Sequence, residues 1–111
     1  MGFEFRINEI ESTYKPVSFC MYQALKITNH FKDDDCTCTI KPQELAVIII
    51  RIENILDCEK LTDKAIKAFR FYDDETEKDI REHLEEANKK FKDALVWSIA
   101  YKEDYLSASC L

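Results

Sequence analysis

The stretch "LAVIIIRIENIL", residues 45 to 56, decides the expected fold. Its large apolar residues recur every three or four positions, which is the spacing of one face of a helix. Further apolar residues occupy the opposite side, and a helix that is apolar around most of its girth belongs in the centre of a bundle. Pro42 is tolerated in a first helical turn. We therefore predict a central helix over 42–57.

A buried strand over 45–52 is the alternative for the same stretch, because four residues there are β-branched. The periodic pattern continues for longer than a strand usually does. The helix is accordingly the preferred interpretation.

The rest of the chain predicts further helices around this one. Helical spacing of apolar residues marks the ranges 16–31, 63–72 and 75–105, with Thr62 as the N-cap of the second. An Asp74–Glu77 spacing like that of a capping box opens the third. Phe3, Phe5 and Ile7 alternate with polar residues, which predicts a short strand or an extended arm. The expected fold is all-α: residues 1–111 form a single domain, a four-helix bundle with a short N-terminal arm and a long C-terminal helix.

Composition excludes several classes of protein. Gly2 is the only glycine among 111 residues, so a phosphate-cradling loop, a dinucleotide-binding turn and an EF-hand are excluded. The net charge of −6 argues against nucleic-acid binding, which requires a basic surface.

We expect neither a membrane span nor a secretory signal. The five cysteines cannot all pair within the chain, and we expect reduced thiols in the cytoplasm.

The segment "DDDCTC", residues 33 to 38, raises the question of a metal site. In an extended segment Cys36 and Cys38 point to the same side, and His30 could add a third ligand. Zinc sites usually take two CxxC-like pairs, whereas this chain has one CxC and no second pair. We predict a connection between two helices, without a metal or cofactor. A metal- or redox-responsive regulator built on these three residues remains an alternative, as does an enzyme with a cysteine nucleophile.

Residues 73 to 86 are strongly acidic, with eight acids and two bases. Charges four residues apart could pair along the helix and leave a solvated face, as in Glu77–Arg81, Lys78–Glu82, Glu85–Lys89 and Glu86–Lys90. The alternative is a surface that docks a basic protein. The residues predicted for that contact are Glu75, Asp79, Glu82 and Glu86.

The stretch "ALVWSIAY", residues 94 to 101, predicts a second part of the binding site. Leu95 and Ile99 continue the predicted inner face of the C-terminal helix. Trp97, Tyr101 and Tyr105 then form a line on its opposite side, and tryptophan and tyrosine are typical interface anchors. We predict a homodimer through this line.

The function expected from the sequence is non-enzymatic protein binding. The predicted type is an inhibitor, immunity protein, antagonist or adaptor that acts through the acidic and aromatic C-terminal helix. The sequence contains no motif that names the partner.

Overall fold

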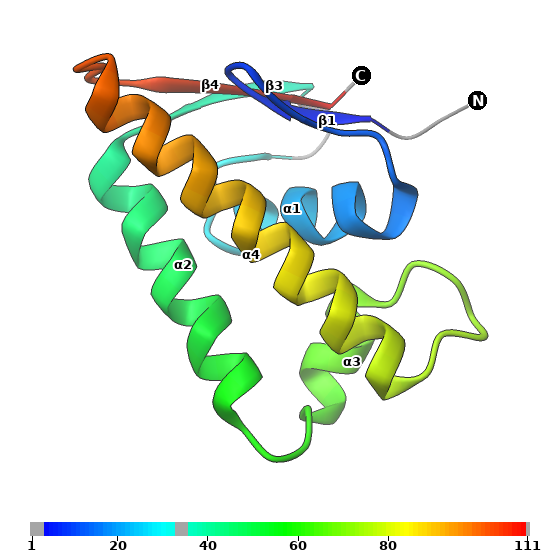
Figure 1. The fold of residues 1–111 in the computed structure, drawn as a ribbon. Coiled ribbons are helices and arrows are strands. Elements are labelled where there is room, and N and C mark those ends of the chain that lie inside the picture. The colour runs from blue at the N-terminus through cyan, green and yellow to red at the C-terminus, as the bar shows by residue number, and fades with distance from the viewer. Residues whose placement is uncertain (1–3, 33–35, 111) are drawn as a thin grey trace.

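The structure is a computed structural model that describes residues 4–32 and 36–110. In these residues four helices and four strands follow one another in the order ββαβαααβ. Three of the four helices lie against one face of a single sheet, so the molecule has two layers (Figure 1). The prediction of an all-α bundle is therefore wrong, and the fold is mixed α/β.

The sheet has four antiparallel strands in the order β2-β1-β4-β3. Strands β1 (Phe5–Ile7) and β2 (Ile10–Ser12) form a hairpin. Strand β4 (Leu106–Cys110) lies between β1 and β3 (Thr37–Ile40). The sheet thus brings together segments from opposite ends of the sequence.

Three of these strands, β2, β3 and β4, were missed because each is short and contains few large apolar residues. Thr37 and Thr39 are exposed, whereas Cys38 is half-buried and Ile40 is fully buried. In β4 the serines alternate in the same way with the inward-facing Leu106, Ala108 and Cys110. This alternation of period two was the available signal. Thr37 and Cys38 of the "DDDCTC" segment therefore begin a strand, Cys36 directly precedes it, and Asp33 to Asp35 lie outside the described residues.

The N-terminal arm is a true strand in its described part. Phe5 and Ile7 are fully buried and face the helices, while Arg6 between them is exposed. Phe3, the first residue of the predicted arm, lies outside the described residues.

The central helix is confirmed: α2 spans Pro42–Asp57, and the alternative of a strand is wrong. Helix α1 spans Lys15–Ile27 and ends four residues earlier than expected. Helix α3 spans Asp63–Phe69, and Thr62 is its N-cap as predicted, with Oγ1 accepting from the Ala65 amide at 3.1 Å.

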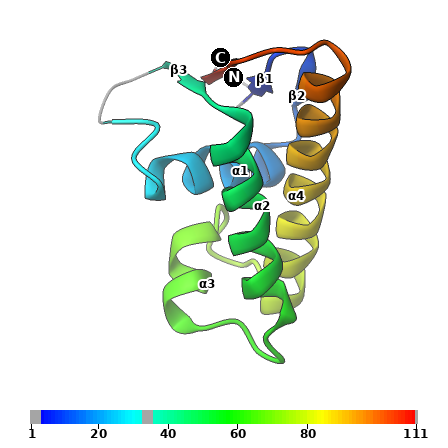
Figure 2. The same ribbon diagram turned by 90° about the vertical axis from the view of Figure 1, so that its left-hand side faces the viewer.

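Helix α4 spans Glu77–Ala100, so it is shorter at both ends than the predicted range of 75–105. The capping box at its start is formed by Thr76 and Asp79, not by Asp74 and Glu77. Helices α2 and α4 lie side by side in both views, and α3 lies at the end of the molecule away from the sheet (Figures 1 and 2).

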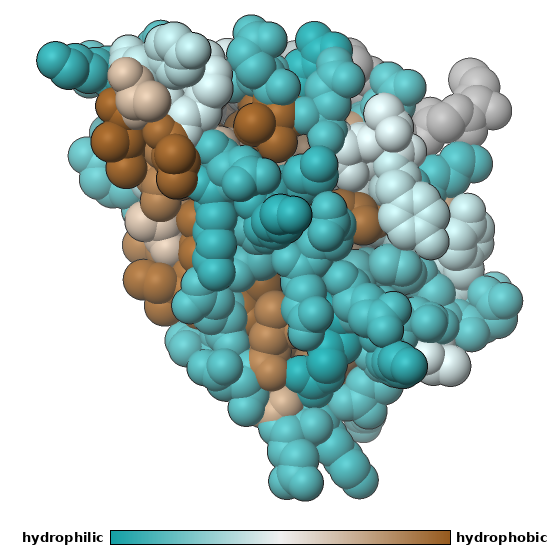
Figure 3. All heavy atoms as spheres, viewed as in Figure 1, coloured by the Kyte–Doolittle hydropathy of each residue, from teal (hydrophilic) through white to brown (hydrophobic). Residues whose placement is uncertain are grey.

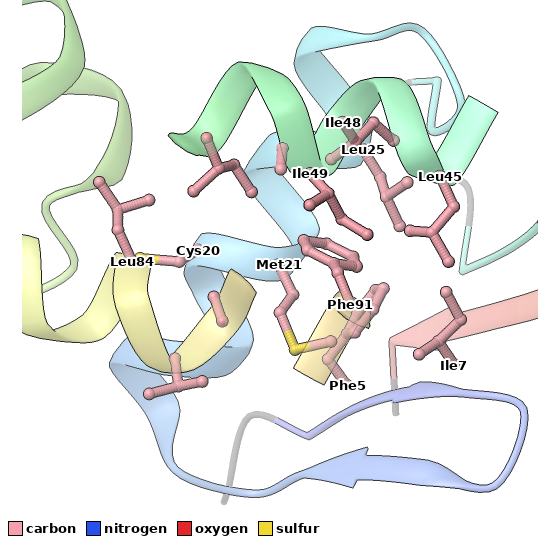
Figure 4. Packing of buried hydrophobic residues seen from close by; sticks show 14 of the residues in the cluster. Phe5, Ile7, Cys20, Met21, Leu25, Leu45, Ile48, Ile49, Leu84 and Phe91 are labelled. Atoms are coloured by element: carbon pink, nitrogen blue, oxygen red, sulfur yellow. The ribbon is translucent and has the colours of Figure 1, made fainter. Parts of the chain in front are cut away.

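The core lies between the sheet and helices α1, α2 and α4. Phe91 of α4 is fully buried and lies among Met21, Ile49 and Phe5, which come from α1, α2 and β1 (Figure 4). One side chain thus contacts both layers, and helices and strands share a single core.

Turns that commonly use glycine are made here by other residues. Asn8 in the hairpin and Asn29 after α1 have φ of 48° and 64°, and asparagine tolerates this region. Lys102 after α4 has φ of 53°, where a lysine is less favourable. The scarcity of glycine therefore did not exclude a sheet. Among the described helices, none has the length and apolar character needed to cross a membrane.

Candidate functional site

Helix α4 carries all the predicted partner-binding residues except Glu75 and the two tyrosines, which lie just beyond its ends. Glu75 is buried, and its Oε2 accepts from the amides of Phe71 and Tyr72 at 2.7 and 3.3 Å. Its Oε1 lies 3.2 Å from Nδ1 of His83, close enough for attraction although the pair is not aligned as a hydrogen bond. These contacts hold the α3–α4 connection against α4, and they leave little of Glu75 for a partner.

Asp79 also has a structural contact. Its carboxylate accepts from the Thr76 amide at 3.0 Å, while the Asp79 amide donates to Thr76 Oγ1 at 3.2 Å. The Thr76 amide, followed by the Thr76 hydroxyl, lowers the pKa of Asp79. Thr76 and Asp79 therefore satisfy each other's backbone amides in the first turn of α4.

Glu77 and Arg81 clamp the loop between α2 and α3. The guanidinium of Arg81 donates to the carbonyls of Leu56 and Cys58 at 2.7 and 3.0 Å. Glu77 accepts from the Leu61 amide at 2.6 Å and lies 3.7 Å from Arg81. Sequence reasoning identified this charge pair but missed its contacts with the loop, because the pair's distance from residues 56–61 depends on the fold.

Glu82 and Glu86 remain as exposed acids on the middle of α4. Their predicted partners were Lys78 and Lys90, and neither pair forms an ion pair in the part of the chain that the structure describes. Of the four predicted acids, these two are therefore available to a partner, as are the exposed Asp73, Asp74 and Glu85 of the same segment.

Aliphatic side chains are exposed where the C-terminal half of α4 lies beside α2. Val96 and Ile99 of α4 are 65% and 69% exposed, and Ile50 of α2 is 56% exposed. The two helices run in opposite directions, and Lys92 contacts Glu53 at 3.0 Å. One turn further along α4 from Lys92 is Val96, and one turn back along α2 from Glu53 is Ile50. We call the surface formed by Ile50, Val96 and Ile99 the apolar corner.

Hydrophobic residues gather over the C-terminal end of α4 and the adjoining part of α2 (Figure 3). The predicted inner face of α4 was wrong at this end. Ala94 and Ser98 are buried there, whereas Ile99 is exposed. The sequence pattern could not separate these positions, because nearly every residue in the last two turns is apolar.

The aromatic line predicted on α4 is only partly on the surface. Trp97 is half-buried against the core, and its ring lies 4.8 Å from that of Tyr101. Tyr101 and Tyr105 are exposed, but Tyr105 follows the end of the helix. The three side chains therefore do not form one helical stripe.

A second apolar surface is a groove of about 260 Å³ between α1, α2 and α3. Its walls include Ile48, Ile52 and Phe69, and Arg51 and Lys64 line it as well. The groove lies beside the end of α1 at Ile27 and beside α3, which has seven residues.

The residues of the metal alternative are separated by the fold. His30 contacts Thr28 Oγ1 through Nδ1 at 2.8 Å and Glu44 through Nε2 at 2.9 Å. Over residues 4–32 and 36–110, the structure contains no group of three or more metal-binding side chains. The two ring nitrogens of His30 are thus engaged by Thr28 at the end of α1 and by Glu44 at the start of α2.

Cys20 is buried, and its thiol lies near enough to Glu75, which contacts His83, to be influenced by that carboxylate. Burial, together with the nearby Glu75, raises the pKa of its thiol to about 12. A thiol that stays protonated in the core is a poor nucleophile.

Comparison with known proteins adds no relative. No protein family model, no curated protein and no solved structure matches this chain.

Proposed function

We propose that the protein is a non-enzymatic binding module that associates with a second copy of itself through the apolar corner. The observation that carries this proposal is the exposure of three large aliphatic side chains in one patch. Single exposed aliphatic residues are ordinary on a protein surface, whereas a contiguous group is typical of an interaction site. Their positions on two packed helices keep the patch rigid.

A two-fold arrangement suits this surface because each copy can present the same ridge to the other. Covering one large aliphatic side chain stabilises a complex by about 1.5–3 kcal/mol before the cost of association. Two copies contribute six such side chains, and Tyr101 extends the apolar area at the end of α4.

The test is the molar mass in solution, measured by light scattering over a range of protein concentrations. We expect a dimer for the wild type and a folded monomer for the Val96→Ser, Ile99→Ser double variant. Ile27→Ser is the matched control, because Ile27 is an exposed isoleucine away from the apolar corner. A wild-type protein that stays monomeric at high micromolar concentration would contradict the proposal.

A second candidate function is the docking of a basic protein partner on Glu82 and Glu86. It is favoured by the absence of ion pairs at these two carboxylates in the described structure. Reversing both to lysine should slow association with such a partner and weaken the salt dependence of the rate. Unchanged association kinetics would mean that the two carboxylates are ordinary solvent-exposed groups that do not contact the partner.

A further inference from the structure

Three of the five cysteines lie on the same face of the sheet, the face that meets the helices. In β3, Cys38 shares that face with the buried Ile40, and Cys36, which directly precedes β3 and is exposed, continues the same alternation. In β4, Cys110 shares the face with the buried Leu106 and Ala108. The sheet therefore collects thiols that are far apart in the sequence.

Cys36 and Cys110 are directly opposite each other across β3 and β4. The register pairs Thr37 with Ser109, so the next residues outward are Cys36 and Cys110. The amide of Cys110 donates to the carbonyl of Cys36 at 2.9 Å. Opposed residues of this hydrogen-bonded kind have Cα atoms about 5.5 Å apart, within the range of about 4.4–6.8 Å that a disulfide spans.

We propose that Cys36 and Cys110 form a reversible dithiol–disulfide site that joins β3 to β4. The proposed oxidant is a small soluble disulfide such as glutathione disulfide. Cys36 is exposed and is the sulfur that this reagent reaches first. Cys110 is half-buried beside it, and burial followed by the neighbouring Cys36 raises the pKa of its thiol.

The reaction takes place in two exchange steps. The Cys36 thiolate attacks one sulfur of glutathione disulfide, forms a mixed disulfide and releases one glutathione thiolate. The Cys110 thiolate then attacks the Cys36 sulfur and releases the second glutathione. The protons lost by the two cysteines are taken up by the two glutathione thiolates, so two protein thiols are oxidised and one glutathione disulfide is reduced.

Cys38 is the competing partner for Cys36, and geometry disfavours it. Two residues apart along a strand, their Cα atoms are about 6.8 Å from each other, at the limit of what a disulfide spans. Cys38 itself is opposite Ala108. Cys58 is exposed and lies after α2, away from the sheet.

The experiment incubates the full chain with glutathione disulfide and reads intact mass and tryptic peptides without reduction. Trypsin leaves Cys36 and Cys38 together in residues 33–51, because Pro42 follows Lys41, and leaves Cys110 in residues 103–111. We expect the wild type to lose two hydrogens at this site and to yield these two peptides joined. Cys58→Ser and Cys38→Ser should yield the same joined peptides.

The variants Cys36→Ser and Cys110→Ser separate the proposed route from its rivals. Cys110→Ser should stop at a stable glutathione adduct on Cys36, and Cys36→Ser should give no joined peptide. The oxidised wild type should also unfold at a higher denaturant concentration than the reduced wild type, a shift that Cys110→Ser loses. A disulfide confined to residues 33–51, or a stable glutathione adduct on Cys36 in the wild type, would overturn the proposal.

Discussion

The two halves of α4 differ in what their side chains contact. Around the N-terminal half, Glu75, Asp79 and Arg81 are charged and hydrogen-bond to the backbone of neighbouring segments. In the C-terminal half, Val96 and Ile99 are aliphatic and more than half exposed. Several charged groups of the N-terminal half are thus occupied by structural contacts, whereas two of the large aliphatic side chains of the C-terminal half face solvent.

This difference shows that density of charge in a sequence is a weak guide to a binding surface. Carboxylates cluster at the start of α4 partly because amides at a helix N-terminus and in nearby turns need acceptors. Exposed aliphatic side chains satisfy no such need within the chain. The following changes test whether the two halves differ in this way, starting with the largest expected effect.

Phe91 and Ile99 are apolar residues of α4 with opposite environments. Phe91→Ala should lower the free energy of unfolding by about 3–5 kcal/mol, because it opens a cavity between the layers. Ile99→Ala should change it by less than about 0.5 kcal/mol when measured on the monomer. Denaturant titration at low protein concentration measures both. Equal losses would mean that the end of α4 is packed as tightly as its middle.

Glu75 and Glu86 test the same contrast for carboxylates. Glu75→Ala removes the acceptor of two amides in a buried turn and should lower the free energy of unfolding by about 1–3 kcal/mol. Glu86→Ala is the matched control and should have an effect below about 0.5 kcal/mol. If Glu75→Ala left the free energy of unfolding unchanged, Glu75 would again be a candidate for contact with a partner.

Asp79 makes the stability that the N-terminal half of α4 contributes depend on pH. Its pKa is lowered in the folded protein, so the stabilisation is present above the unfolded pKa of about 3.9 and is lost as pH falls through the folded pKa. Asp79→Asn should therefore be less stable than the wild type near neutral pH, and this difference should shrink below about pH 4. Glu82→Gln, at an exposed site without these hydrogen bonds, should show a much smaller difference. Chemical unfolding at several pH values would measure it.

Lys102 ends α4 with a left-handed backbone, and the Glu103 amide donates to the Ser98 carbonyl at 2.9 Å. Lys102→Gly should raise the free energy of unfolding by about 0.5 kcal/mol, because relief of the left-handed conformation outweighs the extra freedom of glycine in the unfolded chain. Lys89→Gly, inside the helix, should be destabilising instead. Loss of stability in Lys102→Gly would mean that the end of α4 is held by other contacts.

Local sequence predicted the helices better than the layers. Helix α2 was predicted to the residue because Pro42 and the apolar spacing both mark it. Residues 37–40 and 106–110 were missed because each strand is short, and its stability comes from pairing with the other. For the candidate site, the sequence identified the C-terminal end of α4 but assigned Ile99 to the wrong side. Side-chain placement there depends on α2, which approaches from one side only.

The position of β4 has a consequence for the order in which the protein can fold. Strand β4 pairs Phe5 with Cys110 and also separates β1 from β3. The chain between Phe5 and Cys110 must close into one long loop before these strands can pair. Closing this loop costs entropy before any strand contact compensates for it, and such non-local pairing slows folding. Helices α1 to α4 are all synthesised before residues 106–110. The pairing of β1 and β3 with β4, and the burial of Leu106 and Ala108, can therefore form only after all four helices have been synthesised.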